Sequence, residues 1–196
     1  MADWITGFIE THGYWAIATL MALENVLPPI PSELIMPFAG FHAAQGALDP
    51  ALVVAAGAAG SLAGTLPWYW LGQRLGQRRL EHLAERHGRW LTVSREEVER
   101  ATRWFERHDA RAVFGGRLVP AVRSIISAPA GVARMALPRF LLWSTAGTLI
   151  WCSALAGAGF TLRERHEAAA RWIGPVSEAI VVAALAAWLW RVLRRR

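Results

Sequence analysis

The chain has 196 residues, 54% of them hydrophobic, and includes 11 tryptophans. Its apolar residues are not scattered as in a soluble core, because 50–72 and 140–162 each run for 23 residues without a formal charge, long enough to cross a bilayer. The net charge of +6 does not indicate nucleic acid, since the arginines alternate with acids and no binding motif is present. We therefore expect one all-α polytopic membrane domain over 1–196, with about four transmembrane helices.

The N-terminal segment predicts a retained membrane helix over 5–23. Asp3 and Glu10 stand where a signal peptide would begin with basic residues, and no clean small-residue cleavage site follows a compact apolar core. We therefore expect these residues to stay part of the protein.

The stretch 24–41 is apolar enough for a bilayer, yet it holds two acids, Glu24 and Glu33, and four prolines. Proline removes a backbone donor and clashes with the preceding turn, so no ordinary spanning helix is expected. Broken backbone at membrane depth is tolerated where protein or a watery cavity satisfies it, and acids there usually face such a cavity. We interpret about 24–46 as a re-entrant hairpin ahead of the span 50–72, although a polar loop between two helices is the alternative. The residues expected to shape this hairpin are Pro28, Pro29, Pro31, Pro37 and Gly40.

Within the span 50–72, Gly60 and Gly64 form a small-xxx-small pair that lets another helix approach closely.

A long polar stretch over 73–111 follows the first half. The polar stretch contains ten arginines and seven acids, and Ser94 begins a capping-box pattern that predicts the start of an amphipathic helix. We expect it to be a cytoplasmic connector, because positive residues prefer that side.

The stretch 112–135 is also apolar and broken, and it carries Arg117 and Arg123. We interpret it as a second re-entrant hairpin, followed by a span at 140–162 and a C-terminal span at 172–190. Four spans and the positive-inside rule place both termini in the cytoplasm. The residues expected to shape the second hairpin are Gly116, Pro120, Pro129 and Gly131.

The two broken stretches are related by a repeat. A shift of 91 residues places 27–41 on 118–132, with a proline and an Ala-Gly pair at matching positions. This predicts an inverted repeat whose first half is 1–72 and whose second half is 112–162. Paired broken segments in oppositely oriented halves are typical of secondary transporters, which bind substrate where the segments meet near the midplane.

One predicted hairpin carries acids and the other arginines. In a low-dielectric cleft either pair alone would be costly, whereas together they compensate. The guanidinium presents a fixed fork of donors that suits phosphate, which makes Arg117 and Arg123 candidate substrate-binding residues. Glu24 and Glu33 are candidate proton-coupling residues, because a carboxylate in such a cleft can take up and release a proton. The alternative is that the four charges form static ion pairs that hold the hairpins together.

Four sets of residues form recognisable motifs: Glu24-Asn25 with Pro31-Ser32-Glu33, Gly116-Arg117-Leu118-Val119-Pro120 with Arg123, Ala130-Gly131 with Met135, and Phe140 ahead of Trp151. These motifs resemble those of the DedA family, also called the VTT or SNARE-associated Golgi protein domain family. The resemblance spans roughly 15–160 and implies two re-entrant hairpins in inverted repeat, a place in the bacterial inner membrane, and movement of lipids between leaflets. Bacterial members are implicated in recycling the phosphorylated polyprenyl carrier of wall synthesis, and eukaryotic relatives scramble phospholipids.

Proton-dependent members of that family require two acids and two arginines. By motif the arginines fall on Arg117 and Arg123, and the first acid falls on Glu24. The second would be Glu33, where some members instead have Asp in a differently spaced loop.

These observations predict a membrane lipid transporter that flips undecaprenyl phosphate with protons as coupling partners. The alternatives are an uncoupled phospholipid scramblase, a proton-coupled small-ion or drug exchanger, an assembly factor, and a lipid phosphatase. The six histidines form no metal-ligand spacing, so we expect neither an enzyme nor a cofactor or metal. Cys152 has no second cysteine to pair with and is expected to be a packing residue. Small-residue helix faces permit a homodimer without requiring one.

Overall fold

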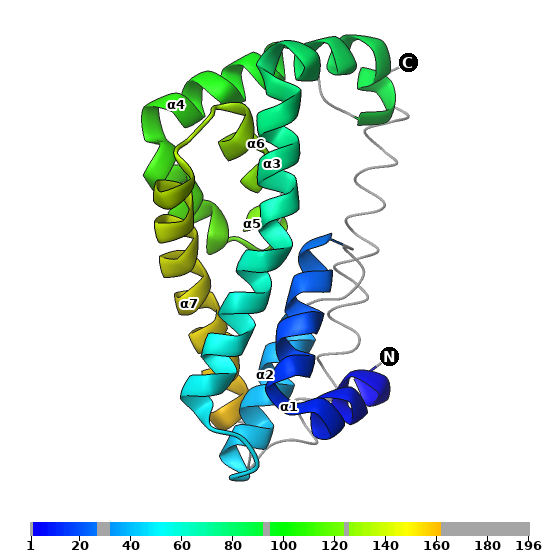
Figure 1. Cartoon of the computed structure of the whole chain (residues 1–196), viewed down its shortest axis with the longest axis vertical. Helices are drawn as coiled ribbons and strands as arrows, with labels where there is room; N and C mark the ends of the chain where they lie inside the picture. Colours follow the sequence, from blue (N-terminus) through cyan, green and yellow to red (C-terminus); the bar gives the residue numbers. More distant parts are fainter. Residues whose placement is uncertain (1, 27–31, 92–94, 124–125, 162–196) are drawn as a thin grey trace. The chain divides into compact units, whose positions relative to one another are not determined.

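The computed structural model describes residues 2–26, 32–91, 95–123 and 126–161. Within these ranges every regular element is a helix, in agreement with the predicted all-α class. The predicted C-terminal span and the three prolines Pro28, Pro29 and Pro31 lie outside the described residues. The helices, labelled in Figure 1, are α1 Ala2–Val26, α2 Ser32–Ala44, α3 Pro50–Leu91, α4 Arg95–Arg117, α5 Pro120–Arg123, α6 Ser127–Val132 and α7 Leu137–Thr161.

The chain forms two compact units. Unit 1 consists of the described part of 1–66 together with 144–161, and unit 2 consists of the described part of 67–143. The long helices α3 and α7 therefore each contribute one segment to each unit.

Two helices within the described ranges are long and apolar enough to cross a membrane: the Pro50–Gln77 part of α3, and α7. The predicted span over 5–23 is not one continuous helix, because α1 breaks at Gly13, where φ is 56° and ψ is −130°. Glycine adopts a positive φ without the steric penalty of a Cβ, so the break falls at the residue best suited to it.

The long helix α3 continues past the predicted end of its span. It runs on to Leu91 and breaks at Gly76, where φ is 62° and ψ is 169°. Figure 1 shows the helix bending near this end. The apolar run ends at Gly72, but Gln73, Arg74 and Leu75 all favour helix, so the backbone turns only at the next glycine.

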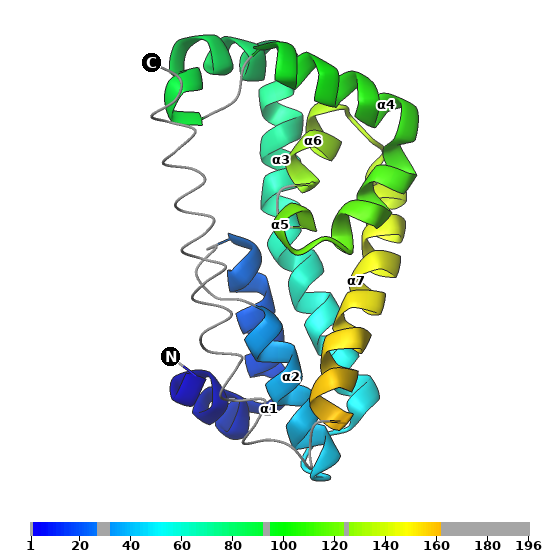
Figure 2. The ribbon, with the colours of Figure 1, turned by 180° about the vertical axis from the view of Figure 1, so that it is seen from behind.

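Unit 1 is built around the pair α1 and α2, which lie side by side in both Figure 1 and Figure 2. The two helices are separate elements, as the prolines of this stretch predict, but Pro37 lies inside α2 rather than ending it. A proline at this position removes only the bond to the Glu33 carbonyl near the helix start. The buried core residues of unit 1 are Ile5, Ile9, Ala16, Ile17, Leu20, Met21, Leu34, Ile35, Met36, Ala39, Ala43, Val53, Cys152 and Ala156.

Glycines let the helices of unit 1 approach at backbone distance. A Cβ at Gly40 of α2 would overlap the backbone of Ala156 on α7, and one at Gly60 of α3 would overlap the backbone of Ala18 on α1. The close approach predicted for the small-residue pair of α3 is therefore confirmed. Cys152 is fully buried in the core of unit 1, in agreement with its predicted packing role.

Unit 2 has its own core around Tyr69, Phe105 and Phe140. The Tyr69 ring stacks on Phe140 with centroids 4.7 Å apart, and its hydroxyl donates to the carbonyl oxygen of Met135. Gly131 of α6 packs against the Tyr69 backbone, where a Cβ would overlap the carbonyl oxygen. These contacts fix α6 and the start of α7 to the end of α3.

The chain between Arg117 and α7 is broken into short pieces, whereas 112–117, including Gly116, continue α4 as helix instead of belonging to the predicted broken stretch. Pro120 is the first residue of α5, and Pro129 lies in the first turn of α6. At these positions an amide N–H would have no intrahelical acceptor, so proline removes no helix bond. The prolines therefore limit where each piece begins.

Candidate functional site

Arg117 ends α4 and is one of the most deeply buried side chains of unit 2, with 2% of its surface exposed. Its Nη2 donates to the Ser127 hydroxyl at 3.1 Å, and its Cζ lies 5.9 Å from the centroid of the Phe140 ring. The cation is attracted by the ring face, and the carbonyl end of α4 also favours a positive charge. These contacts orient the guanidinium within the unit.

Arg123 is the last residue of the four-residue helix α5 and is only 4% exposed. Its backbone N–H donates to the Val119 carbonyl at 2.9 Å, which sets the turn that carries it. The neighbouring side chains of Val119 and Val122 are 47% and 38% exposed, so apolar surface flanks the buried charge. Burying a guanidinium is costly, and unit 2 buries two of them, which is typical of functional charge in membrane proteins.

The acids lie in unit 1. Glu24 is near the end of α1 and is 7% exposed, whereas Glu33 is half-buried in the first turn of α2. An acid in a first turn is stabilised by the positive end of the helix, so Glu33 also favours the start of α2. The neighbouring Ser32 is fully buried and accepts a hydrogen bond from Trp151 Nε1 at 3.4 Å.

Asn25 links α1 to α3 beside Glu24. Its Nδ2 donates to the Met21 carbonyl at 2.9 Å and to the Ser61 hydroxyl at 3.2 Å, and its side chain is 2% exposed. Thr65, one turn beyond Ser61 on α3, is fully buried as well. Buried polar side chains therefore gather near the end of α1.

Replacing Asn25 with alanine is expected to destabilise the protein by about 1 kcal/mol, because interhelical hydrogen bonds in membranes contribute about this amount. Thermal unfolding in detergent measures the change. Ser61→Ala removes the acceptor of the same interhelical bond. The double variant should therefore lose less stability than the sum of the losses in the two single variants. Additive losses would show that the bond carries little energy.

The predicted site residues thus divide between the units. Arg117 and Arg123 are both buried in unit 2, and Glu24 and Glu33 belong to unit 1, so a site shared by acids and arginines stays a prediction. Ser127 was missed by sequence reasoning as a partner of Arg117. In the sequence, Ser127 is distinguished only by a hydroxyl within the same broken apolar stretch. No spacing rule predicts which residues pair across such a break.

Comparison with known proteins identifies the family of the chain. The sequence model of the VTT domain matches residues 30–161. The chain belongs to the VTT domain family. The VTT match includes Glu33 and both arginines but begins after Glu24. The DedA resemblance expected from the motifs is therefore confirmed.

Three bacterial relatives align with most of this VTT chain. It is 37% identical over 182 residues to the alkaline phosphatase-like protein of Lactococcus lactis subsp. cremoris, covering 92% of this chain and 85% of the relative. It is 37% identical over 164 residues to undecaprenyl phosphate transporter A of Staphylococcus aureus, covering 84% and 81%. It is 26% identical over 193 residues to undecaprenyl phosphate transporter A of Bacillus subtilis, covering 98% and 93%. No solved structure matches the chain.

Proposed function

We propose that this protein is a membrane lipid transporter that moves undecaprenyl phosphate, the phosphorylated polyprenyl carrier, across the bacterial inner membrane. The observation that carries the proposal is the burial of Arg117 and Arg123, at 2% and 4% exposure, in one unit of a chain with two apolar helices of spanning length. A buried guanidinium donates charge-assisted hydrogen bonds, and a phosphate headgroup offers the negative charge and the oxygen acceptors that suit such bonds. The two relatives named undecaprenyl phosphate transporter A support this choice of lipid.

The surroundings of Arg117 suit it to hold a phosphate. Ser127 and Phe140 orient the guanidinium before any ligand arrives, so little ordering is required when a phosphate binds. Low dielectric around the buried charge strengthens its attraction for an anion. The prenyl tail would stay in the bilayer, and no large dry pocket is needed for it.

The proposed transporter is an inverted repeat with two re-entrant hairpins and both termini in the cytoplasm. Support comes from Gly40 and Gly131, which are 91 residues apart in the repeat. Each lies on a short helix and packs against the backbone of a long apolar helix, α7 in unit 1 and α3 in unit 2. Equivalent residues thus make equivalent contacts within their own units.

We further propose that Glu24 and Glu33 couple movement of the lipid to protons. In proteoliposomes with labelled polyprenyl phosphate, a pH gradient is expected to raise the transport rate of the native protein several-fold. Glu24→Gln keeps the size of the side chain but loses its titration, so the gradient should no longer accelerate transport.

Glu10→Gln is the matched control for this test, because Glu10 lies on the same helix but its side chain is 57% exposed. It should respond to the gradient as the native protein does. If the gradient leaves the native rate unchanged, the protein is an uncoupled scramblase. If Glu24→Gln still responds, the coupling role of this acid is wrong. Transport of a small ion or drug without lipid flux would instead indicate the exchanger.

A lipid phosphatase is the second candidate function, because one relative is named alkaline phosphatase-like protein. Among the residues that the structure describes, no three His, Cys, Asp or Glu side chains gather as ligands for a metal ion. Incubation with polyprenyl phosphate in detergent distinguishes the two functions. A transporter releases no inorganic phosphate, whereas a phosphatase releases it in proportion to the enzyme added.

A further inference from the structure

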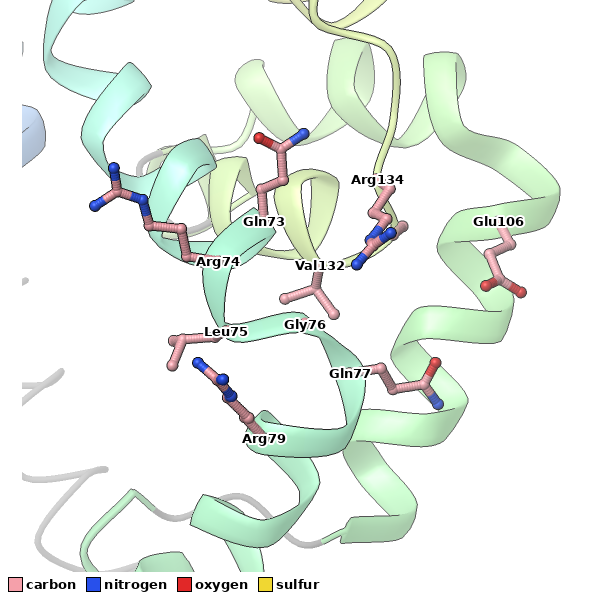
Figure 3. Close-up of a pocket in the computed structure, with 10 residues that line it drawn as sticks. Gln73, Arg74, Leu75, Gly76, Gln77, Arg79, Glu106, Val132 and Arg134 are labelled. Carbon is pink, nitrogen blue, oxygen red and sulfur yellow. The ribbon is translucent and has the colours of Figure 1, made fainter.

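A cavity of about 780 Å³ opens in unit 2 beside the bend of α3. It lies between the Gly76 bend of α3, the exposed side of α4 and the segment that follows α6 (Figure 3). Arg117 and Arg123 do not line it, so it is separate from the site proposed above. The lining residues that carry charge are Arg74, Arg79, Glu106 and Arg134.

The cavity is basic. Three arginines and one glutamate give its lining a formal charge of 3 − 1 = +2. Two glutamines, Gln73 and Gln77, add amide groups to the same wall. In Figure 3 Arg134 lies beside Val132 at one side of the Gly76 turn and Arg79 lies beside Leu75 at the other, whereas the Arg74 guanidinium points away from the turn. Arg79 and Arg134 are therefore the main candidate donors.

Arg134 occupies an unusual backbone position. Its φ is 53°, in the left-handed region that glycine usually fills. Its N–H donates to the Gly131 carbonyl at 2.9 Å, and the Met135 N–H donates to the Ala130 carbonyl at 3.1 Å. This pair of bonds is a Schellman motif that ends α6, in which glycine is the preferred residue at the position of Arg134. An arginine at this position carries a backbone strain that glycine would avoid, which points to a role for its side chain.

The cavity also lies where the apolar part of α3 ends. The membrane-compatible segment of α3 stops at Gln77, and Trp70 and Leu71, one to two turns earlier, are 48% and 46% exposed. Exposed tryptophan followed by arginine marks the level of lipid headgroups, and basic residues there attract anionic lipid. The same basic residues would face the cytoplasm in the topology proposed above.

We propose that this cavity binds a phosphate group, carried by the headgroup of an anionic lipid at the membrane surface or by phosphate in solution. Arg134 holds the phosphate oxygens by charge-assisted hydrogen bonds, and Arg79 adds positive charge to the same lining. Glu106, at the α4 edge, opposes the anion and limits its affinity. Occupation by a lipid would fasten the bend of α3 to the membrane surface.

Arg134→Gly provides the test, because glycine is preferred at this backbone position and removes only the charged side chain. Calorimetric titration of the purified full chain in neutral detergent compares short-chain phosphatidic acid, short-chain phosphatidylcholine and inorganic phosphate. The native protein should bind phosphatidic acid at least tenfold more tightly than phosphatidylcholine, and Arg134→Gly should lose about tenfold in this affinity. Its melting temperature without ligand should be equal to or higher than that of the native protein.

Two further variants make the result decisive. Arg139→Gln removes an arginine of the same unit that pairs with Asp109 at 3.0 Å and does not line the cavity, so it should bind as the native protein does. Glu106→Gln should bind phosphatidic acid about twofold more tightly, a gain that misfolding cannot imitate. Tighter binding of phosphatidic acid than of inorganic phosphate identifies the lipid as the source, and the reverse order identifies phosphate in solution. The proposal would be overturned if Arg134→Gly and Arg139→Gln lost equal affinity for phosphatidic acid. It would also be overturned if the native protein bound neither phosphatidic acid nor inorganic phosphate.

Discussion

Replacing Arg117 with lysine is expected to slow lipid transport by about 30-fold, which corresponds to about 2 kcal/mol of lost stabilisation of the transition state. Lysine keeps the positive charge but lacks the planar fork that holds two phosphate oxygens at once. It also loses the guanidinium geometry that Ser127 and Phe140 orient. Proteoliposomes with labelled polyprenyl phosphate measure the rate, and Arg123→Lys should show the same direction of change.

Arg139→Lys is the matched control for both variants. Its guanidinium pairs with Asp109 in unit 2 but is 57% exposed, so a point charge should serve there equally well. Circular dichroism and thermal unfolding establish that each variant is folded. If Arg117→Lys and Arg123→Lys both move lipid at the native rate, neither residue holds the phosphate. If they fold normally and lose transport, a purely structural ion-pair role is excluded.

Replacing Gly159 with alanine is expected to destabilise the protein by about 3 kcal/mol, because a Cβ there would overlap the backbone of Pro37 on α2. Backbone atoms cannot move aside as the end of a flexible side chain can, so the two helices must separate. Gly40→Ala meets the backbone of Ala156 on the other side of the same contact and should lose a similar amount. Thermal unfolding in detergent measures both losses.

Gly157 supplies the control on the same helix. It lies two residues before Gly159, and a Cβ there would meet nothing within 4 Å. Gly157→Ala should therefore be neutral or stabilise the protein by about 0.5 kcal/mol, since alanine is the better helix former. If Gly157→Ala and Gly159→Ala lose equal amounts of stability, the loss comes from replacing a glycine within α7 and not from the contact between α7 and α2.

The sequence predicted those parts of the fold that depend on local chemistry. Long apolar runs predicted the spanning segments of α3 and α7, and the Gly60 pair predicted the close approach of another helix. Each follows from residues that lie near one another in the chain. The effect of Pro37 was overestimated, because a proline near a helix start removes a single bond and α2 continues through it.

The site was predictable in its charges but not in its contacts. Charge in an apolar stretch is conspicuous, so Arg117, Arg123 and Glu24 were found, and all three are buried. The hydrogen bond from Arg117 to Ser127 depends on how α4, α5 and α6 turn, which no sequence period encodes. The left-handed backbone of Arg134 was missed for the same reason, since the residue type gives no sign of it.

The contact between Pro37 and Gly159 has a consequence for biosynthesis. Unit 1 joins the first 66 residues to a segment that begins at Ser144, so α2 emerges from the ribosome long before the helix it packs against. Until then its glycine-bearing face has only lipid or the insertion machinery as a neighbour. Unit 1 therefore completes its packing only after α7 has been synthesised. A truncated chain that stops in the polar connector would lack the α7 segment against which α2 packs.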